Sequence, residues 1–295
     1  MNYMSKAVAF LALATLVAGC KSTPPNPQEE NLTGTRCMVF SSVKDLSTEH
    51  LDYVREASSN GNVKCKIALG VLYEFGRGGL SPDVRKARAL YESVAVVDGA
   101  GYEQLARMAD EGSGQAPDAV EARRLYQLAL AHRQSVYSEF ALARLMEAGR
   151  GGPQDLSGAL THYLNATQRI DDEAWAGVQR VRAQVLTLTT EQTQRYNEKW
   201  YDGVGNSLAA AIHDTELLLN RQIKPGTASK PVTLEAKGKP GSLVPQITLV
   251  ESSGNNDVDQ AVVKALSEYR YPAQPILKAG QESWSSEFPV KVGVK

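Results

Sequence analysis

The sequence predicts a mainly helical protein, in which a helix-turn-helix repeat solenoid (an α/α superhelix) precedes a small α+β domain. Three observations predict this fold class. One pattern of leucine, glycine, aspartate and tyrosine residues recurs three times between residues 65 and 166, at intervals of about 35 to 37 residues, which is the period of helix-turn-helix solenoids. Residues 224–230 have the composition of a linker. Beyond that linker, the spacing of apolar residues indicates strand, strand, helix and strand.

The N-terminus is predicted to direct secretion. Residues 1–19 have the short apolar run of a signal peptide. The pentapeptide Leu-Val-Ala-Gly-Cys at 16–20 resembles the bacterial lipobox, which implies that Cys20 is lipidated and that acyl chains anchor the protein to a membrane. An ordinary signal peptide with an incidental cysteine is the alternative. Lys21 then implies the outer membrane, facing the periplasm, and the Pro-rich residues 20–36 are expected to be a flexible tether.

Two cysteines, Cys37 and Cys65, remain in the mature chain. In an oxidising periplasm an even pair favours a disulfide, whose loop closure stabilises the fold by about 3 to 4 kcal/mol in the chain-entropy model. The alternative is two buried small residues, because Cys65 occupies an alanine position of the repeat. A metal site is not expected, since no histidine or cysteine lies at ligand spacing around either residue.

Each copy of the repeat contains two helices separated by a glycine-rich turn. Apolar residues before and after the glycines have helical spacing. A proline and an aspartate begin the second helix, where proline needs no N–H and the aspartate meets the positive end of the helix dipole. Each tyrosine is expected to fill the gap to the next unit. The residues that define the copies are Leu69, Gly76, Gly78, Asp83 and Tyr91; Leu105, Gly112, Gly114, Asp118 and Tyr126; and Leu142, Gly149, Gly151, Asp155 and Tyr163.

These residues resemble the Sel-one-like repeat, a relative of the tetratricopeptide repeat. The first copy matches the pattern almost fully, whereas the second and third have Ala106 and Ala143 where the pattern has glycine. The resemblance implies an α-solenoid that binds proteins and performs no chemistry.

The repeat array is expected to span residues 37–223, with degenerate units at both ends. Ser47 has the features of an N-cap and begins the second helix of an incomplete leading unit. After the third copy, apolar residues keep helical spacing, and a helix at 190–200 is expected to close the array. A further helical segment at 207–223 either seals the array or bridges onward.

Residues 231–295 form the predicted α+β domain. The order strand, strand, helix, strand, with Val-Glu-Ser-Ser-Gly at 250–254 and Tyr271-Pro272 after the helix, resembles the C-terminal domain of TonB and related periplasmic proteins. The resemblance implies this fold and a habit of binding peptides. The Pro-Lys-rich spacer of TonB is missing, so energy coupling itself does not carry over.

The last strand of this domain is expected to be an exposed edge that binds an extended peptide by adding it to the sheet. Pro289 and Gly293 interrupt this strand, and both residue types are common on edges. Trp284 is either a core plug or a peptide anchor. The domain is expected to fold on its own, because the linker has few residues that could bind it to the solenoid. The candidate peptide-binding residues are Trp284, Phe288, Val290 and Val292.

Catalysis, nucleic-acid binding and cofactor binding are not expected. The net charge is −1 and no basic stripe appears, which argues against a nucleic-acid partner. No catalytic motif occurs, and the four histidines fall in predicted helices among polar neighbours. The glycine-rich turns recur with the repeat, so a structural role is favoured over phosphate binding. For two weaker candidates, a nucleophile turn and an arginine ligand site, the structural interpretations of a strand-to-helix loop and a solvated helix face are favoured. The residues concerned are Ser252, Ser253 and Gly254, and Arg123, Arg124 and Arg133.

The leading hypothesis is therefore a non-enzymatic lipoprotein that acts as a scaffold for other envelope proteins or peptides. It is expected to face the periplasm and to need no cofactor, metal or small-molecule substrate. The alternative is a component of a TonB-like system that couples energy or transport across the envelope.

Overall fold

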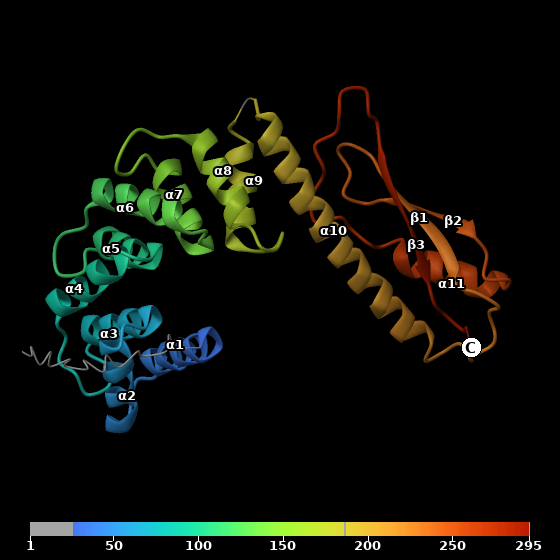
Figure 1. Cartoon of the computed structure of the whole chain (residues 1–295). Coiled ribbons are helices and arrows are strands. Elements are labelled where there is room, and N and C mark those ends of the chain that lie inside the picture. Colours follow the sequence, from blue (N-terminus) through green and yellow to red (C-terminus); the bar gives the residue numbers. More distant parts are fainter. Residues whose placement is uncertain (1–25, 186, 295) are drawn as a thin grey trace, which may run out of the picture.

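The computed structural model describes residues 26–185 and 187–294, which form an arch of helices followed by a small lobe with a three-stranded sheet (Figure 1). The mainly helical fold with a C-terminal antiparallel sheet is confirmed. The helices are α1 Pro27–Ser42, α2 Thr48–Ser59, α3 Val63–Phe75, α4 Val84–Ala95, α5 Gly99–Glu111, α6 Ala119–His132, α7 Val136–Glu147, α8 Leu156–Ala166, α9 Glu173–Arg182, α10 Thr190–Leu219 and α11 Asn256–Leu266. The strands are β1 Val232–Gly238, β2 Gln246–Glu251 and β3 Trp284–Val290.

Each repeat is a helical hairpin whose turn is specified by its aspartate and glycines. The side chains of Asp83, Asp118 and Asp155 are the N-caps of α4, α6 and α8, and each accepts a hydrogen bond from a backbone N–H of the first turn. Gly76 and Gly112 end α3 and α5 in the left-handed conformation, with φ of 61° and 79°. A side chain is strained in this conformation, which explains the repeated glycine.

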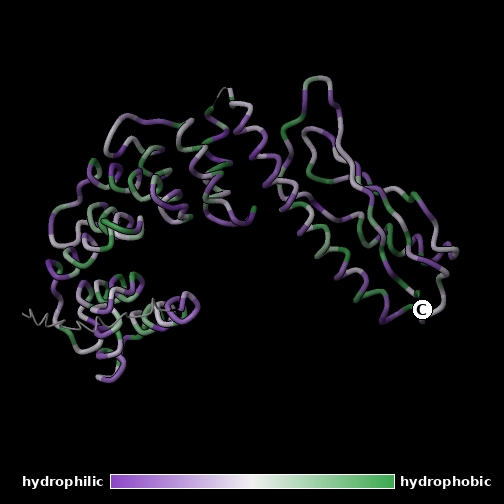
Figure 2. Tube along the Cα trace, viewed as in Figure 1, coloured by the Kyte–Doolittle hydropathy of each residue, from purple (hydrophilic) through white to green (hydrophobic). Residues whose placement is uncertain are grey.

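The tyrosines of the repeats lie in a core that runs from the first repeat into the C-terminal lobe, and the leading unit has a core of its own around the two cysteines. Tyr91, Tyr126 and Tyr163 are fully buried, and the ring of Tyr91 occupies the space that a Cβ on Gly70 would need. Figure 2 shows apolar and polar residues interspersed along the helices of the arch, as expected for helices that pack on their neighbours on one side. The odd-numbered helices α1 to α9 lie towards the inner side of the arch and the even-numbered ones towards its outer side (Figure 1).

The predicted tether is wrong for residues 27–36, which form the first part of α1. Asn26 caps this helix, Pro27 stands at its start, and two acidic residues occupy its first turn, so its N-terminus is well specified despite the polar composition. One side of the helix is buried at Gly34, Cys37 and Ser41. The leading unit is therefore complete, because α1 supplies the first helix that the sequence analysis did not identify.

The two helical segments predicted at 190–200 and 207–223 are one helix, α10, of 30 residues and about 45 Å in length. Thr189 and Gln192 form a full capping box at its start. The glycines between the two segments do not break it. Gly203 faces Ile170, whose side chain fills the space that a Cβ would need, so this glycine permits close packing against the loop after α8.

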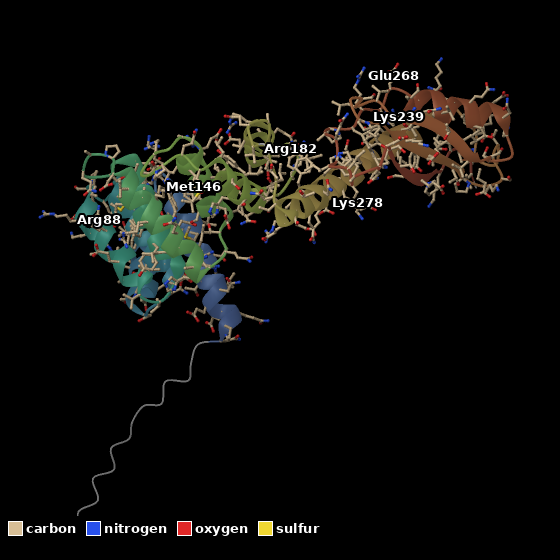
Figure 3. The ribbon with its side chains drawn as sticks, turned by 90° about the horizontal axis from the view of Figure 1, so that it is seen from above. Arg88, Met146, Arg182, Lys239, Glu268 and Lys278 are labelled. Atoms are coloured by element: carbon tan, nitrogen blue, oxygen red, sulfur yellow. A yellow bond between two sulfur atoms is a disulfide. The ribbon has the colours of Figure 1, made fainter. Side chains whose placement is uncertain are left out.

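The C-terminal sheet has the strand order β2-β1-β3, with both pairs antiparallel. The side chains of β1 alternate, so that Val232, Leu234 and Ala236 are buried on one face. Val262 and Leu266 of α11 are also fully buried in this core. Figure 3, which is viewed from above, shows the solenoid and this lobe as two bodies joined by α10.

The lobe packs closely on α10, whereas the sequence analysis expected few contacts between the lobe and the solenoid. The indole N–H of Trp200 donates to the carbonyl of Ala273 at 2.8 Å, and the hydroxyl of Tyr196 donates to that of Gln274 at 2.9 Å. The side-chain amide of Asn197 bonds both the N–H and the C=O of Ile276, each at 2.8 Å. The helix predicted to close the solenoid thus supplies part of the core of the lobe.

The segment 224–230 is likewise bound and does not act as a free linker. The N–H groups of Gly226 and Ala228 donate to the carbonyl of Gly293, and Ser229 N–H donates to that of Ser253. Proline, glycine and small residues are common in tight turns as well as in linkers. The composition of this segment therefore fits its bonded path along the end of the sheet as well as it fitted a linker.

Candidate protein-binding surfaces

The inner side of the solenoid is formed by the first helix of each unit. The residues that define the repeat support this surface without being part of it. Leu69, Leu105 and Leu142 are buried, and the glycines of the turns have positive φ. These residues do not come together in one site. They hold the inner helices in register and leave other side chains of those helices at the surface.

The arch has one recurring polar feature that the sequence analysis missed. In the first unit, Glu74 accepts hydrogen bonds from the hydroxyls of Tyr91 and Ser113, at 3.0 and 2.8 Å, and pairs with Arg107 of the next inner helix. The contacts with Tyr91 and Arg107 cross to other helices, and Ser113 lies in the turn after α5. The network therefore joins the first and second repeats through a buried acid.

An equivalent network joins the third repeat to α9. Glu147 pairs with Arg180 of α9 at 2.6 Å and accepts a hydrogen bond from the hydroxyl of Tyr163 at 2.6 Å. The acid stands two residues before the turn glycine in every repeat, as Glu74, Asp110 and Glu147. Arginines also recur 36 to 37 residues apart, at 107, 144 and 180. These two recurring positions are the sequence signal that could have identified the networks.

At Glu74 the hydrogen bonds and charges of the network lower the pKa by more than burial raises it. Burial alone would raise the pKa of this carboxyl, but the hydrogen bonds and charge of Arg107, with the hydroxyls of Ser113 and Tyr91, hold the pKa below its usual value. Burial raises the pKa of Tyr91, and the neighbouring carboxylate raises it further. The acid is thus ionised and the phenol neutral at physiological pH, which the hydrogen bond between them requires.

The described surface includes two grooves. One, of about 610 Å³, lies between α1 and the starts of α3 and α5, with Met38, Lys64 and Glu103 among its lining residues. The other, of about 820 Å³, lies between α10 and the segment 276–278. Both volumes lie within the range typical of binding pockets.

Cys37 of α1 and Cys65 of α3 are bonded as a disulfide, and both are fully buried. The bridge fixes the leading unit to the first repeat and closes a loop across 28 positions of the chain. The signal peptide and the lipidation residue Cys20 lie outside the described residues.

Counting thiols tests this disulfide in the isolated protein. The purified chain, denatured without reductant, should contain no free thiol at positions 37 and 65, since both sulfurs are bonded. Reduction should then release two thiols and lower the free energy of unfolding by about 3 kcal/mol, as expected for a loop of this length. Two thiols that react before reduction would show that the cysteines are only neighbours in the core.

The edge strand β3 does not offer the peptide-binding surface that the sequence analysis proposed. Phe288, Val290 and Val292 are buried, and their side chains point into the core. Trp284 packs against Trp200 and Tyr271, with ring centroids 6.0 and 5.8 Å apart. It is therefore a core residue.

The C-terminal end of β3 and the residues after it are also closed to an added strand. Pro289 has no N–H, and the N–H groups of Lys291 and Gly293 donate to Glu216 and Asn220 of α10, at 2.6 and 2.8 Å. These three positions therefore offer no free donor to an added strand.

The opposite edge, β2, lacks these protections. Leu249 and Val250 are about half exposed, at 46% and 50%, and β2 is hydrogen-bonded to a strand on one side only. Pro245 precedes the strand and a register shift lies at its far end, but the residues between carry no lysine or proline. β2 is therefore the more open edge of the sheet.

The weaker candidates from the sequence have structural roles here. Ser252 donates to Asp259 at 2.6 Å and Ser253 N–H donates to the same carboxylate at 2.9 Å, so this pair caps the loop before α11. The arginines at 123 and 124 are held by Pro153 and Glu121. Across residues 26–185 and 187–294, no group of three or more histidine, cysteine or acidic side chains is arranged to hold a metal ion.

Among the same described residues, no helix has the length and apolar character needed to cross a membrane.

Three segments of the chain match the family model described as Sel1 repeat, at residues 63–95, 100–132 and 136–169. They coincide with the hairpins α3–α4, α5–α6 and α7–α8. Sel1 repeats generally mediate protein–protein interactions and are typically non-enzymatic.

The fold is similar to two solved structures. A Sel1 repeat protein from Oxalobacter formigenes is 21% identical, with a TM-score of 0.44, over 66% of this chain and 76% of that one. A protective antigen of uropathogenic Escherichia coli strains that has an SLR fold is 18% identical, with a TM-score of 0.45, over 66% of this chain and 41% of that one. No curated protein matches the chain. The three central hairpins of the arch are Sel1 repeats.

Proposed function

We propose that this protein is a lipid-anchored scaffold of the bacterial envelope, which faces the periplasm and holds partner proteins on two surfaces. The observation that carries the proposal is the combination of an arch of Sel1 repeats with a lobe whose sheet has an open edge, both fixed to the same helix, α10. Such a body presents two surfaces at a constant separation, which suits an adaptor.

The first surface is the inner side of the arch, where helices from five units lie side by side. The second is the edge of β2, to which an extended peptide can add as a further strand, with main-chain hydrogen bonds giving affinity and alternate side chains giving selectivity. The exposed Leu249 and Val250 would contact the apolar side chains of such a peptide. The TonB-like character of the lobe is part of this proposal and rests on the strand-strand-helix-strand order.

The lipid anchor is tested by replacing Cys20. The variant Cys20→Ser should move the protein from the membrane fraction to the soluble fraction and should not incorporate labelled fatty acid, because the thiol that would carry the acyl chains is gone. A matched variant, Cys37→Ser, keeps Cys20 and should stay in the membrane fraction. Cys20→Ser protein that remains membrane-bound, or wild-type protein without label, would show that this anchor does not exist.

A second candidate function is a part in TonB-like coupling across the envelope, favoured by the same strand order in the lobe. Coupling requires a connection to an inner-membrane motor, so binding would respond to the proton gradient. Partner crosslinks that persist after the gradient is collapsed would support the scaffold, and crosslinks that disappear would support coupling.

A further inference from the structure

The row of arginines on the inner helices contains one member without a partner. Arg107 on α5, Arg144 on α7 and Arg180 on α9 occupy equivalent positions of successive units, 36 to 37 residues apart. Arg107 pairs with Glu74 and Glu111, and Arg180 pairs with Glu147. Within the described residues, the guanidinium of Arg144 forms neither an ion pair nor a hydrogen bond, and its side chain is exposed.

The reason lies in the acid of the preceding repeat. Glu74 and Glu147 reach the arginine of the next inner helix. The equivalent residue of the second repeat is Asp110, whose side chain is one methylene shorter. Asp110 is contacted by Arg150 instead, in an ion pair at 2.8 Å that lacks hydrogen-bond geometry. The shorter acid thus leaves Arg144 available where its equivalents are neutralised.

An aromatic ring adjoins the Arg144 guanidinium. The guanidinium lies over the ring of Phe140, 5.9 Å from its centroid, and stacking of this kind orients the group without neutralising it. One turn before Phe140 on the same helix, Tyr137 is 44% exposed. The nearest acid along the helix, Glu147, is already bound by Arg180 and Tyr163. The surface therefore offers a positive group beside apolar area.

We propose that Arg144 binds the C-terminal carboxylate of a partner polypeptide, whose last side chain lies against Phe140 and Tyr137. The planar guanidinium can donate two parallel hydrogen bonds to a carboxylate. A C-terminal residue carries its side chain on the carbon next to that carboxylate, so the charged and apolar contacts fall within one residue. This inference rests on the proposed function, since it specifies the class of segment that the inner surface of the arch holds.

The test is a titration followed by NMR of arginine side-chain and backbone signals. The protein is the full chain with Cys20→Ser, which lacks the proposed lipid anchor and is therefore studied without detergent. The probe is N-acetyl-Gly-Leu-Phe with a free carboxylate, compared with its C-terminal amide and with N-acetyl-Glu-Leu-Phe amide, which has only an internal acid. The free carboxylate should cause saturable shifts at Arg144, Phe140 and Tyr137, and both amides should bind at least about tenfold more weakly, because a hydrogen-bonded charge pair is lost.

Two variants complete the test. Arg144→Gln should weaken binding of the free carboxylate by about tenfold while the helical circular dichroism spectrum is unchanged, since the side chain is exposed. Arg85→Gln, which removes an exposed guanidinium from the outer helix α4, should leave binding as it is. Equal binding of the three probes, no saturable binding, or binding unaffected by Arg144→Gln would overturn the proposal. The proposal would also be overturned if N-acetyl-Glu-Leu-Phe amide bound as tightly as the peptide with the free C-terminal carboxylate. Envelope crosslinks from Tyr137 that persist in any of these cases would leave the scaffold function standing.

Discussion

Replacing Glu74 by alanine should lower the free energy of unfolding of the solenoid by about 3 kcal/mol, because it leaves the largely buried Arg107 without its main partner. The side chain of Glu74 is only 2% exposed and that of Arg107 13%. The hydroxyls of Tyr91 and Ser113 would also lose their acceptor. Urea denaturation followed by far-ultraviolet circular dichroism measures the effect.

The matched control is Glu121→Ala. Glu121 also pairs with an arginine, Arg124, but both side chains are well exposed, at 39% and 57%. Exposed ion pairs contribute at most about 1 kcal/mol, so this variant should unfold near the wild-type urea concentration. Equal losses for the two variants would show that the buried network does not hold the repeats together.

The same network gives stability a defined dependence on pH. The pKa of Glu74 is lower in the folded protein than its usual value, so the folded state binds fewer protons than the unfolded state in this range. Its contribution is fully present above the unfolded-state pKa and is lost as pH falls through the lowered folded-state pKa. In the Glu74→Gln variant, the free energy of unfolding should therefore fall less steeply as the pH is lowered, which urea denaturation at a series of acidic pH values measures.

Replacing Trp200 by alanine should detach the C-terminal lobe from α10, with a loss of about 3 to 5 kcal/mol. Trp200 is 7% exposed, packs on Tyr271 and Trp284, and donates its indole N–H to Ala273. The variant should become sensitive to proteolysis in the lobe while the solenoid resists, which limited digestion with mass spectrometry would show.

Tyr201→Ala is the control for this experiment, since Tyr201 is the next residue on the same helix and is 70% exposed. Its loss should leave the protease pattern unchanged. A Trp200→Ala lobe that stays as resistant as the wild type would indicate that the lobe folds without α10, as the sequence analysis expected.

The repeat could be predicted from the sequence because each of its key residues has a strictly local role. Asp83 caps the helix that follows it, and Gly76 takes a conformation that a side chain disfavours. Such requirements can be recognised without knowledge of distant residues. The strand and helix order of the lobe was predictable for the same reason, since alternation and helical spacing are local patterns.

The features that were missed depend on residues far apart in the chain. The sequence analysis ended one helix at residue 200 and began another at residue 207, and the contact of Gly203 with Ile170 shows why the helix continues between them. The edge at β3 looked open because Pro289 marks an edge, whereas its protection comes from Glu216 and Asn220. The partner of Arg107 lies 33 positions away, at Glu74. Long-range contacts of this kind decide which surfaces are free.

Site-specific photocrosslinking in intact cells tests the central claim, which is that the inner arch and the β2 edge hold partners. A photoreactive phenylalanine derivative would replace one exposed residue at a time: Tyr137 on the inner helix α7, Leu249 on β2, and Val97 on the turn after α4. The account predicts discrete adducts with other envelope proteins from Tyr137 and Leu249, and none from Val97, although Val97 is the most exposed of the three, at 71%. Adducts from all three positions alike, or from none, would contradict it.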